Sequence, residues 1–163
     1  MANIGLDTTS QIGHAAPVAI DTTGTFWRGD DFTDLAGYLR EYQPGGYPVT
    51  PVKEMICQRC GGKTFAVLAD DENGCAQTRC LSCGDHALIA DSADYWQDAD
   101  PEECACPCGG EAFQVAVGFA LRADGEVRWV SVGLRCTQDG TLGVYTDWKI
   151  DYSPTGHLLI GAA

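Results

Sequence analysis

Two copies of a Cys-x-x-Cys-Gly motif constrain the fold of this chain more than any other feature of its sequence. The first is Cys57-Gln-Arg-Cys60-Gly and the second is Cys80-Leu-Ser-Cys83-Gly, with 19 residues between Cys60 and Cys80. Each motif can place two thiolates on one side of a tight turn, because the glycine that follows accepts a positive φ. Two such turns joined by a hairpin form a tetrahedral S₄ site, the usual geometry of structural zinc. We therefore predict a metal site at Cys57, Cys60, Cys80 and Cys83.

This pair of motifs resembles the zinc-ribbon group over roughly residues 52–90. The resemblance implies that the metal holds a small sheet together, since metal coordination can supply folding free energy of about 10 kcal/mol. It implies no particular function. Iron bound as in rubredoxin is the rival interpretation, because the ligand set is the same. Rubredoxin-like motifs resemble C-P-x-C-G, whereas Gln58 and Leu81 stand at the proline positions here.

The second half of the sequence repeats these motifs in altered form. Cys60-Gly-Gly-Lys-Thr-Phe65 returns as Cys108-Gly-Gly-Glu-Ala-Phe113. Arg79-Cys-Leu-Ser-Cys83-Gly returns as Arg135-Cys-Thr-Gln-Asp139-Gly. We interpret the chain as a tandem zinc-ribbon protein whose second copy is degenerate.

The ligands of the second copy remain open at this stage. Alignment of the two halves places Ala105 where the first copy has Cys57, with a cysteine on either side of it. Because Asp is a sound zinc ligand, one candidate set is Cys106, Cys108, Cys136 and Asp139. The competing all-sulfur set is Cys104, Cys106, Cys108 and Cys136. The second copy could also bind no metal, and an Asp ligand could mark an open, catalytic metal, but a degenerate structural site is the preferred interpretation.

We expect a mostly β fold of two small antiparallel zinc-ribbon-like sheets with one N-terminal amphipathic helix. The first ribbon has strands predicted at 65–69, 75–79 and 87–90, and the second has longer strands at 113–121, 127–134 and 142–152. These runs alternate or are continuously apolar and are bounded by glycine-rich and acidic turns. An extended stretch at 47–56 contains two prolines and reads as an edge strand.

The helix is predicted between Asp30 or Asp31 and about Tyr42. An aspartate can cap the first turn, apolar residues spaced by 3, 4 and 3 share one face, and Pro44-Gly-Gly ends the helix. We expect it to cover one ribbon.

The predicted organisation has five parts in chain order. They are an N-terminal arm (1–25), the helical segment (26–46), the first ribbon (47–91), an acidic connector (92–103) and the longer second unit (104–163). Tyr95 and Trp96 of the connector are expected to pack against a ribbon. Cys75 is expected to be a buried apolar residue, and His86 a surface residue rather than a ligand.

The charge of the chain indicates the class of its partner. Twenty-three acidic and ten basic residues give a formal charge of −13. Zinc in a Cys₄ site changes the charge by −2 and zinc in a Cys₃Asp site by −1, so the metal-loaded protein carries about −16. Such a field repels phosphate backbones and attracts basic surfaces. We therefore expect a basic protein partner and disfavour direct nucleic-acid binding.

The sequence argues against several other classes. It contains none of the common motifs of serine hydrolases, P-loop proteins, zinc proteases, dinucleotide-binding enzymes or zinc deaminases, so neither an enzyme nor a small-molecule substrate is expected. It has no run of 18 apolar residues, so no membrane span is expected. Its first residues lack the pattern of a signal peptide, so none is expected. Nine cysteines, largely in metal-type spacing, fit a reducing cytoplasm.

Three functions follow from these observations as hypotheses. The first is a non-enzymatic zinc protein that binds a basic protein partner, as an inhibitor, an immunity-type protein or an adaptor. The second is a rubredoxin-like iron electron-transfer protein. The third is a metal-dependent enzyme that uses an open second site containing Asp139.

Overall fold

The computed structural model describes residues 20–161 of the chain. Most of the predicted N-terminal arm, residues 1–19, lies outside the described residues. The strands are β1 (Val52–Glu54), β2 (Phe65–Asp70), β3 (Cys75–Cys80), β4 (His86–Leu88), β5 (Glu102–Glu103), β6 (Phe113–Leu121), β7 (Val127–Cys136) and β8 (Leu142–Lys149). The helices are α2 (Phe32–Tyr42) and α3 (Gly156–Gly161), with 3-10 turns η1 (Pro44–Gly46), η2 (Ser92–Asp94) and η3 (Trp96–Asp98).

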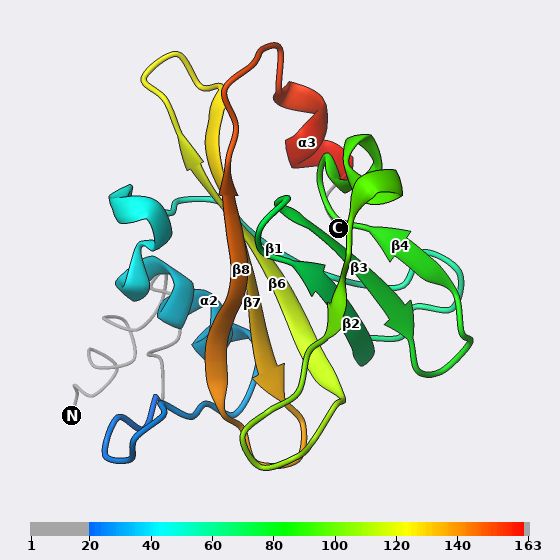
Figure 1. Cartoon of the computed structure of the whole chain (residues 1–163). Helices are drawn as coiled ribbons and strands as arrows, with labels where there is room; N and C mark the ends of the chain where they lie inside the picture. Colours follow the sequence, from blue (N-terminus) through cyan, green and yellow to red (C-terminus); the bar gives the residue numbers. More distant parts are fainter. Residues whose placement is uncertain (1–19, 162–163) are drawn as a thin grey trace, which may run out of the picture.

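All eight strands belong to one antiparallel sheet with the order β4-β3-β2-β6-β7-β8 (Figure 1). Short strand β1 pairs with β6, and β5 pairs with β2. The expected mostly β class is confirmed. The two small sheets expected from the sequence are instead two halves of a single sheet, because Phe65 at the start of β2 pairs with Phe113 at the start of β6.

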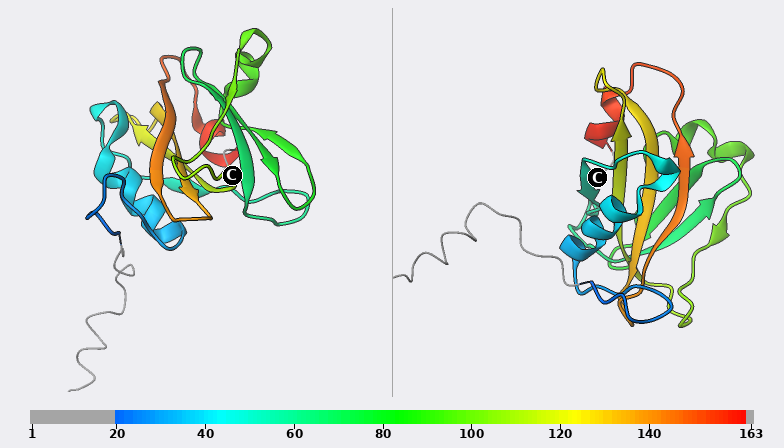
Figure 2. Two further views of the ribbon diagram at one scale, coloured as in Figure 1. Left: turned by 60° about the horizontal axis from the view of Figure 1, so that its bottom comes forward. Right: turned by 90° about the vertical axis from the view of Figure 1, so that its left-hand side faces the viewer.

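Helix α2 covers one face of the sheet at β6, β7 and β8 (Figure 2, right). The Asp31 carboxylate accepts a hydrogen bond from the Asp34 backbone N–H at 3.1 Å and caps the first turn, as the sequence predicts. Leu39 of the helix packs against the sheet where Gly133 has no side chain, since a Cβ at that position would lie 3.0 Å from Leu39. The glycine therefore lets the helix approach the strands closely.

The opposite face of the sheet buries the larger core. Side chains alternate between the two faces of a strand, so the odd-numbered residues of β6 point away from α2. Phe65, Phe113, Phe119 and Leu134 are buried there with Leu158 of α3. The two halves of the sheet therefore share one core.

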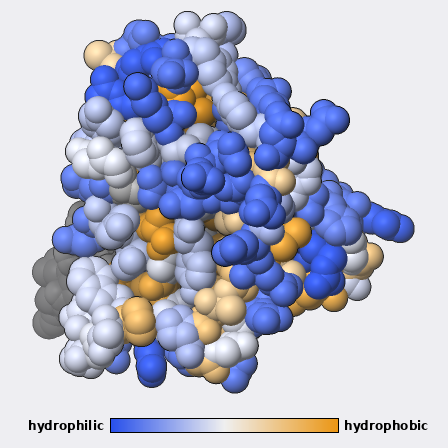
Figure 3. Space-filling view, viewed as in Figure 1, coloured by the Kyte–Doolittle hydropathy of each residue, from blue (hydrophilic) through white to orange (hydrophobic). Residues whose placement is uncertain are grey.

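The face of the molecule seen in the view of Figure 1 is mainly polar. Hydrophilic residues cover most of the face shown in Figure 3, and apolar residues form small separate patches between them. Tyr95 of the acidic connector is 42% exposed, and Trp96 beside it is half-buried. No helix within residues 20–161 has both the length and the apolar character needed to cross a membrane.

Candidate metal centres

The two turns of the first unit bring four thiols together. The ligand atoms of Cys57, Cys60, Cys80 and Cys83 all lie within 4.8 Å of one another. Sγ of Cys57 is 3.6 Å from Sγ of Cys83, and Sγ of Cys60 is 3.5 Å from Sγ of Cys80. A tetrahedral zinc with 2.3 Å bonds separates its sulfurs by about 3.8 Å. The distances therefore match a metal site, and all nine cysteines of the chain are free.

The second unit brings together three thiols and one carboxylate. The group is Cys106, Cys108, Cys136 and Asp139. Sγ of Cys108 is 3.7 Å from Sγ of Cys136, and Sγ of Cys106 is 3.5 Å from Oδ1 of Asp139. Zinc bonds of about 2.3 Å to sulfur and about 2.0 Å to oxygen place such a sulfur and oxygen about 3.5 Å apart. This group also has the dimensions of a tetrahedral metal site.

Cys104 lies outside the second group. Its backbone N–H donates to the Val67 carbonyl at 2.8 Å, which ties it to β2. The side chain is buried, and this burial raises the pKa of the Cys104 thiol to about 11. Of the two ligand sets left open by the sequence, the geometry brings together the one that contains Asp139.

Backbone N–H groups in the turns point at the candidate ligand sulfurs. In the second unit, the N–H of Gly110 lies 3.4 Å from Sγ of Cys108, and the N–H of Gln138 lies 3.4 Å from Sγ of Cys136. In the first unit, backbone hydrogen bonds from Cys83 and then from Ser82 lower the pKa of Cys80 to about 6. Such donors stabilise the thiolate form that a metal requires.

Two glycines make room for the sulfurs and were missed by the sequence reasoning. A Cβ at Gly62 would lie 3.1 Å from Sγ of Cys80, and one at Gly110 would lie 3.0 Å from Sγ of Cys136. The sequence argument used only the glycine that follows each motif, which has positive φ as expected at Gly61. The Gly-Gly pair repeated after Cys60 and Cys108 was the available clue to the second role.

Local contacts hold the Asp139 carboxylate in place. The backbone N–H of Thr141 donates to Oδ1 at 3.0 Å, and this bond is the main reason why the pKa of Asp139 falls to about 2. The guanidinium of Arg28 lies 3.9 Å from Oδ2. The carboxylate is therefore ionised and oriented, which suits a metal ligand.

The segment 27–29 docks on the turn that carries Asp139, a contact that the sequence does not predict. Gly29 donates its backbone N–H to the Gly140 carbonyl at 2.9 Å, and Leu142 donates to the Trp27 carbonyl at 2.8 Å. The Nε–H of Arg135 donates to the Gly29 carbonyl at 2.7 Å. The turn that carries Asp139 is thus joined to the chain that precedes α2.

The sequence correctly predicts the environments of His86 and Cys75. His86 is exposed on β4 and lies outside both ligand groups, while Cys75 is fully buried. Burial also raises the pKa of the Cys75 thiol. Neither residue belongs to a potential metal site among residues 20–161.

The chain matches no protein-family model, no curated protein and no solved structure. The two groups could each hold a metal ion on the strength of their own geometry. Four protein ligands in each group suit a closed structural site, whereas catalytic zinc keeps one position for water or substrate.

Proposed function

We propose that this protein binds two structural zinc ions and acts by binding a basic protein partner in a reducing cytoplasm, without catalysing a reaction. The observation that carries the first part is the spacing of the ligand atoms. Their separations of 3.5–3.7 Å fit tetrahedral coordination by four protein ligands in each group. Closed coordination supports a scaffold role for the metals.

The ligand chemistry favours zinc over iron. Rubredoxin-like iron uses four thiolates, whereas the second group offers an aspartate oxygen that zinc accepts readily. Elemental analysis of the protein purified without added metal is expected to give two zinc ions per chain and colourless protein. Stoichiometric iron with visible absorption would support the electron-transfer alternative instead.

X-ray absorption at the zinc edge tests the coordination and the enzyme alternative together. We expect an average of 3.5 sulfur ligands per zinc, because one group offers four thiolates and the other three. An average of four sulfurs would indicate that Cys104 replaces Asp139 as a ligand. An additional water oxygen on the second zinc would indicate an open site and favour the enzyme.

The charge of the protein supports the second part of the proposal. A net charge of −13 attracts basic surfaces over distances set by the ionic strength. The zinc-loaded chain is expected to bind a hexa-arginine peptide in a calorimetric titration at 50 mM salt, and much more weakly at 300 mM. Equal binding of a hexa-glutamate peptide, or no dependence on salt, would contradict a basic partner.

A further inference from the structure

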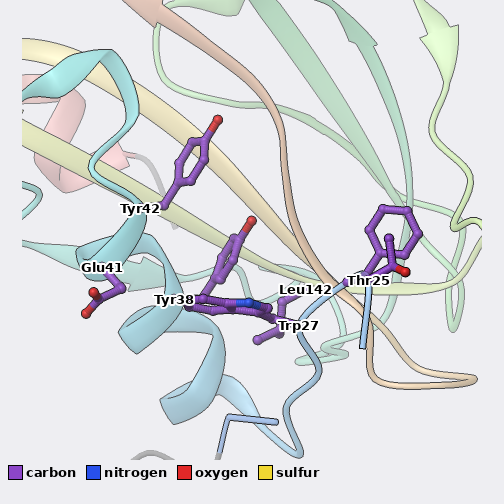
Figure 4. Close-up of a pocket in the computed structure, with 7 residues that line it drawn as sticks. Thr25, Trp27, Tyr38, Glu41, Tyr42 and Leu142 are labelled. Atoms are coloured by element: carbon purple, nitrogen blue, oxygen red, sulfur yellow. The ribbon is translucent and has the colours of Figure 1, made fainter. Parts of the chain in front are cut away.

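An aromatic groove lies between α2 and the chain that leads into it (Figure 4). The hollow has a volume of about 410 Å³. We refer to it as the aromatic groove and define it by Phe26, Trp27, Tyr38, Glu41, Tyr42 and Leu142. It is separate from both ligand groups.

Two side chains of the groove are unusually exposed. Phe26 is 49% exposed and Tyr42 is 56% exposed, and they are two of the four exposed large hydrophobic residues in the described part of the chain. The sequence places Tyr42 on the apolar face of the helix, yet the sheet does not cover it. Exposed aromatic residues that gather around one hollow are typical of interaction sites.

The rings of the groove form an ordered array. Tyr38 meets Trp27 edge to face, with 5.8 Å between ring centroids, and stacks with Tyr42 at 5.9 Å and an interplanar angle of 13°. Figure 4 shows Tyr38 and Tyr42 projecting from the helix in the same direction, with Trp27 against Tyr38. The faces of such rings carry negative potential and attract cations within about 6 Å.

The charged residue that lines the groove is negative, like the potential at the ring faces. Glu41 is exposed and lines the groove, and among residues 20–161 no Lys or Arg lines it. A positively charged side chain in the groove would therefore meet aromatic faces within the field of a protein of charge −13. An anionic ligand would be repelled by both.

The turn that carries Asp139 positions one wall of the groove. Trp27 accepts the backbone N–H of Leu142 at 2.8 Å, and Arg28 forms a bridge with Thr141, two residues after Asp139. The groove thus stands beside the altered copy of the motif. A metal in that copy would fix the turn on which Trp27 rests.

We propose that the aromatic groove is the contact site for the basic partner and takes arginine or lysine side chains from an exposed segment of that protein. This inference rests on the proposed function and adds the place and the chemistry of the contact.

The test is a titration of the zinc-loaded full chain and its variants with the hexa-arginine peptide. Tyr42→Ala is expected to weaken binding by about 3- to 30-fold, the range of one cation–π contact. The matched control is Tyr95→Ala, which removes another exposed tyrosine outside the groove and should bind like the wild type. Glu41→Gln should weaken binding, whereas Glu111→Gln, at an exposed position outside the groove, should have a smaller effect.

Each result separates the groove from the wider proposal. If the wild type binds the peptide and Tyr42→Ala binds equally well, the assignment of the groove as the contact site is wrong, whereas the proposal of a basic partner is unaffected. If the wild type does not bind the peptide at low salt, both proposals fail. Tyr42→Ala could instead leave binding of the arginine peptide unchanged and abolish either binding of a neutral peptide or self-association seen by sedimentation. That result would show that the groove has a different occupant and would overturn this inference.

Discussion

Phe65 and Phe113 are direct antiparallel partners where β2 meets β6. Each is the fifth residue after a candidate ligand cysteine, Cys60 in the first unit and Cys108 in the second. The same position of the repeated motif therefore pairs with itself. An antiparallel pair of equivalent residues has a local two-fold axis between them, so the repeat in the sequence becomes an approximate two-fold relation in the sheet.

The hydrogen bonds beside this pair are reciprocal. Met55, two residues before Cys57, donates its backbone N–H to the Val115 carbonyl at 2.9 Å. Cys104, two residues before Cys106, donates to the Val67 carbonyl at 2.8 Å. The short strand before the first candidate ligand of each half, β1 or β5, thus pairs with a strand of the other half.

This exchange predicts that the first unit does not fold alone. A peptide of residues 47–91 contains all four thiols of the first candidate site but lacks β6, the strand that pairs with β1. Phe65 and Val67 would also lose their partners from the second unit. We expect the peptide with one equivalent of zinc to give a poorly dispersed NMR spectrum, in contrast to the full chain. A spectrum that overlays that of the full chain would contradict the shared core.

The choice of the second ligand set can be tested by two substitutions. Cys104→Ser should leave two zinc ions per chain, because the Cys104 thiol lies outside the ligand group. Asp139→Ala removes a ligand and should lower zinc affinity at the second site by at least about 10-fold. Zinc retained against a chelator measures both effects. The reverse pattern, with loss in Cys104→Ser only, would support the all-sulfur set.

The Cys-x-x-Cys-Gly turns and the hairpins could be predicted from the sequence because their causes are local. Glycine after a candidate ligand cysteine, alternating apolar residues, and the glycine-rich and acidic turns between strands each specify structure within a few residues. Asp31 as a cap and Pro44-Gly-Gly as a stop defined α2 in the same way. Alignment of the halves also identified Asp139 as one of two possible fourth ligands.

The joining of the two units could not be predicted in this way. The pairing of β1 with β6 connects residues more than 60 positions apart, and no local pattern at Val52 indicates which strand will accept it. The same holds for segment 27–29, which is bound to Gly140 and Leu142 through backbone groups that any sequence possesses. Backbone pairing over long distances leaves no mark on residue type, so the single sheet and the aromatic groove were missed.

Gly62→Ala should weaken zinc binding at the first site. The new methyl group would lie 3.1 Å from Sγ of Cys80 and 3.2 Å from Sγ of Cys60, so two of the four ligands must move. We expect a loss of affinity of about 10-fold, similar to other changes next to metal ligands. Competition with a chromogenic chelator measures the affinity. Gly156→Ala is the matched control, since a Cβ there meets nothing within 4 Å, and an equal effect of the two would refute the packing argument.

Asp70 should make stability depend on pH in the acid range. Its carboxylate accepts hydrogen bonds from the Asn73 side chain at 2.7 Å and from the Asp100 backbone at 2.9 Å. These bonds, that of Asn73 first, lower its pKa from 3.8 to about 2. Below about pH 4 the unfolded chain binds a proton that the folded chain does not, so the stabilisation is complete above that pH and declines towards pH 2.

The measurement is the difference in urea midpoint between the wild type and Asp70→Asn at pH 6, 4 and 3. The difference should be largest at pH 6 and shrink at pH 3, because the variant cannot titrate at this position. Release of any bound metal in acid should affect both proteins alike, since Asp70 belongs to neither candidate ligand group. A difference that stays constant with pH would show that the Asp70 charge does not stabilise the fold.

Asp91 connects the end of the first unit to the last strand of the second. Its buried carboxylate accepts hydrogen bonds from Nε1 of Trp148 at 2.9 Å and from the Tyr152 hydroxyl at 2.8 Å. Asp91→Ala leaves both donors without this acceptor and should lower the free energy of unfolding by about 3 kcal/mol. Asp91→Asn keeps an acceptor oxygen and should cost less. Asp94→Ala, which removes an exposed neighbouring carboxylate, is the control and should change stability by less than about 0.5 kcal/mol. Urea unfolding of the zinc-loaded proteins distinguishes these cases, and equal midpoints for Asp91→Ala and Asp94→Ala would rule out a structural role for the buried carboxylate.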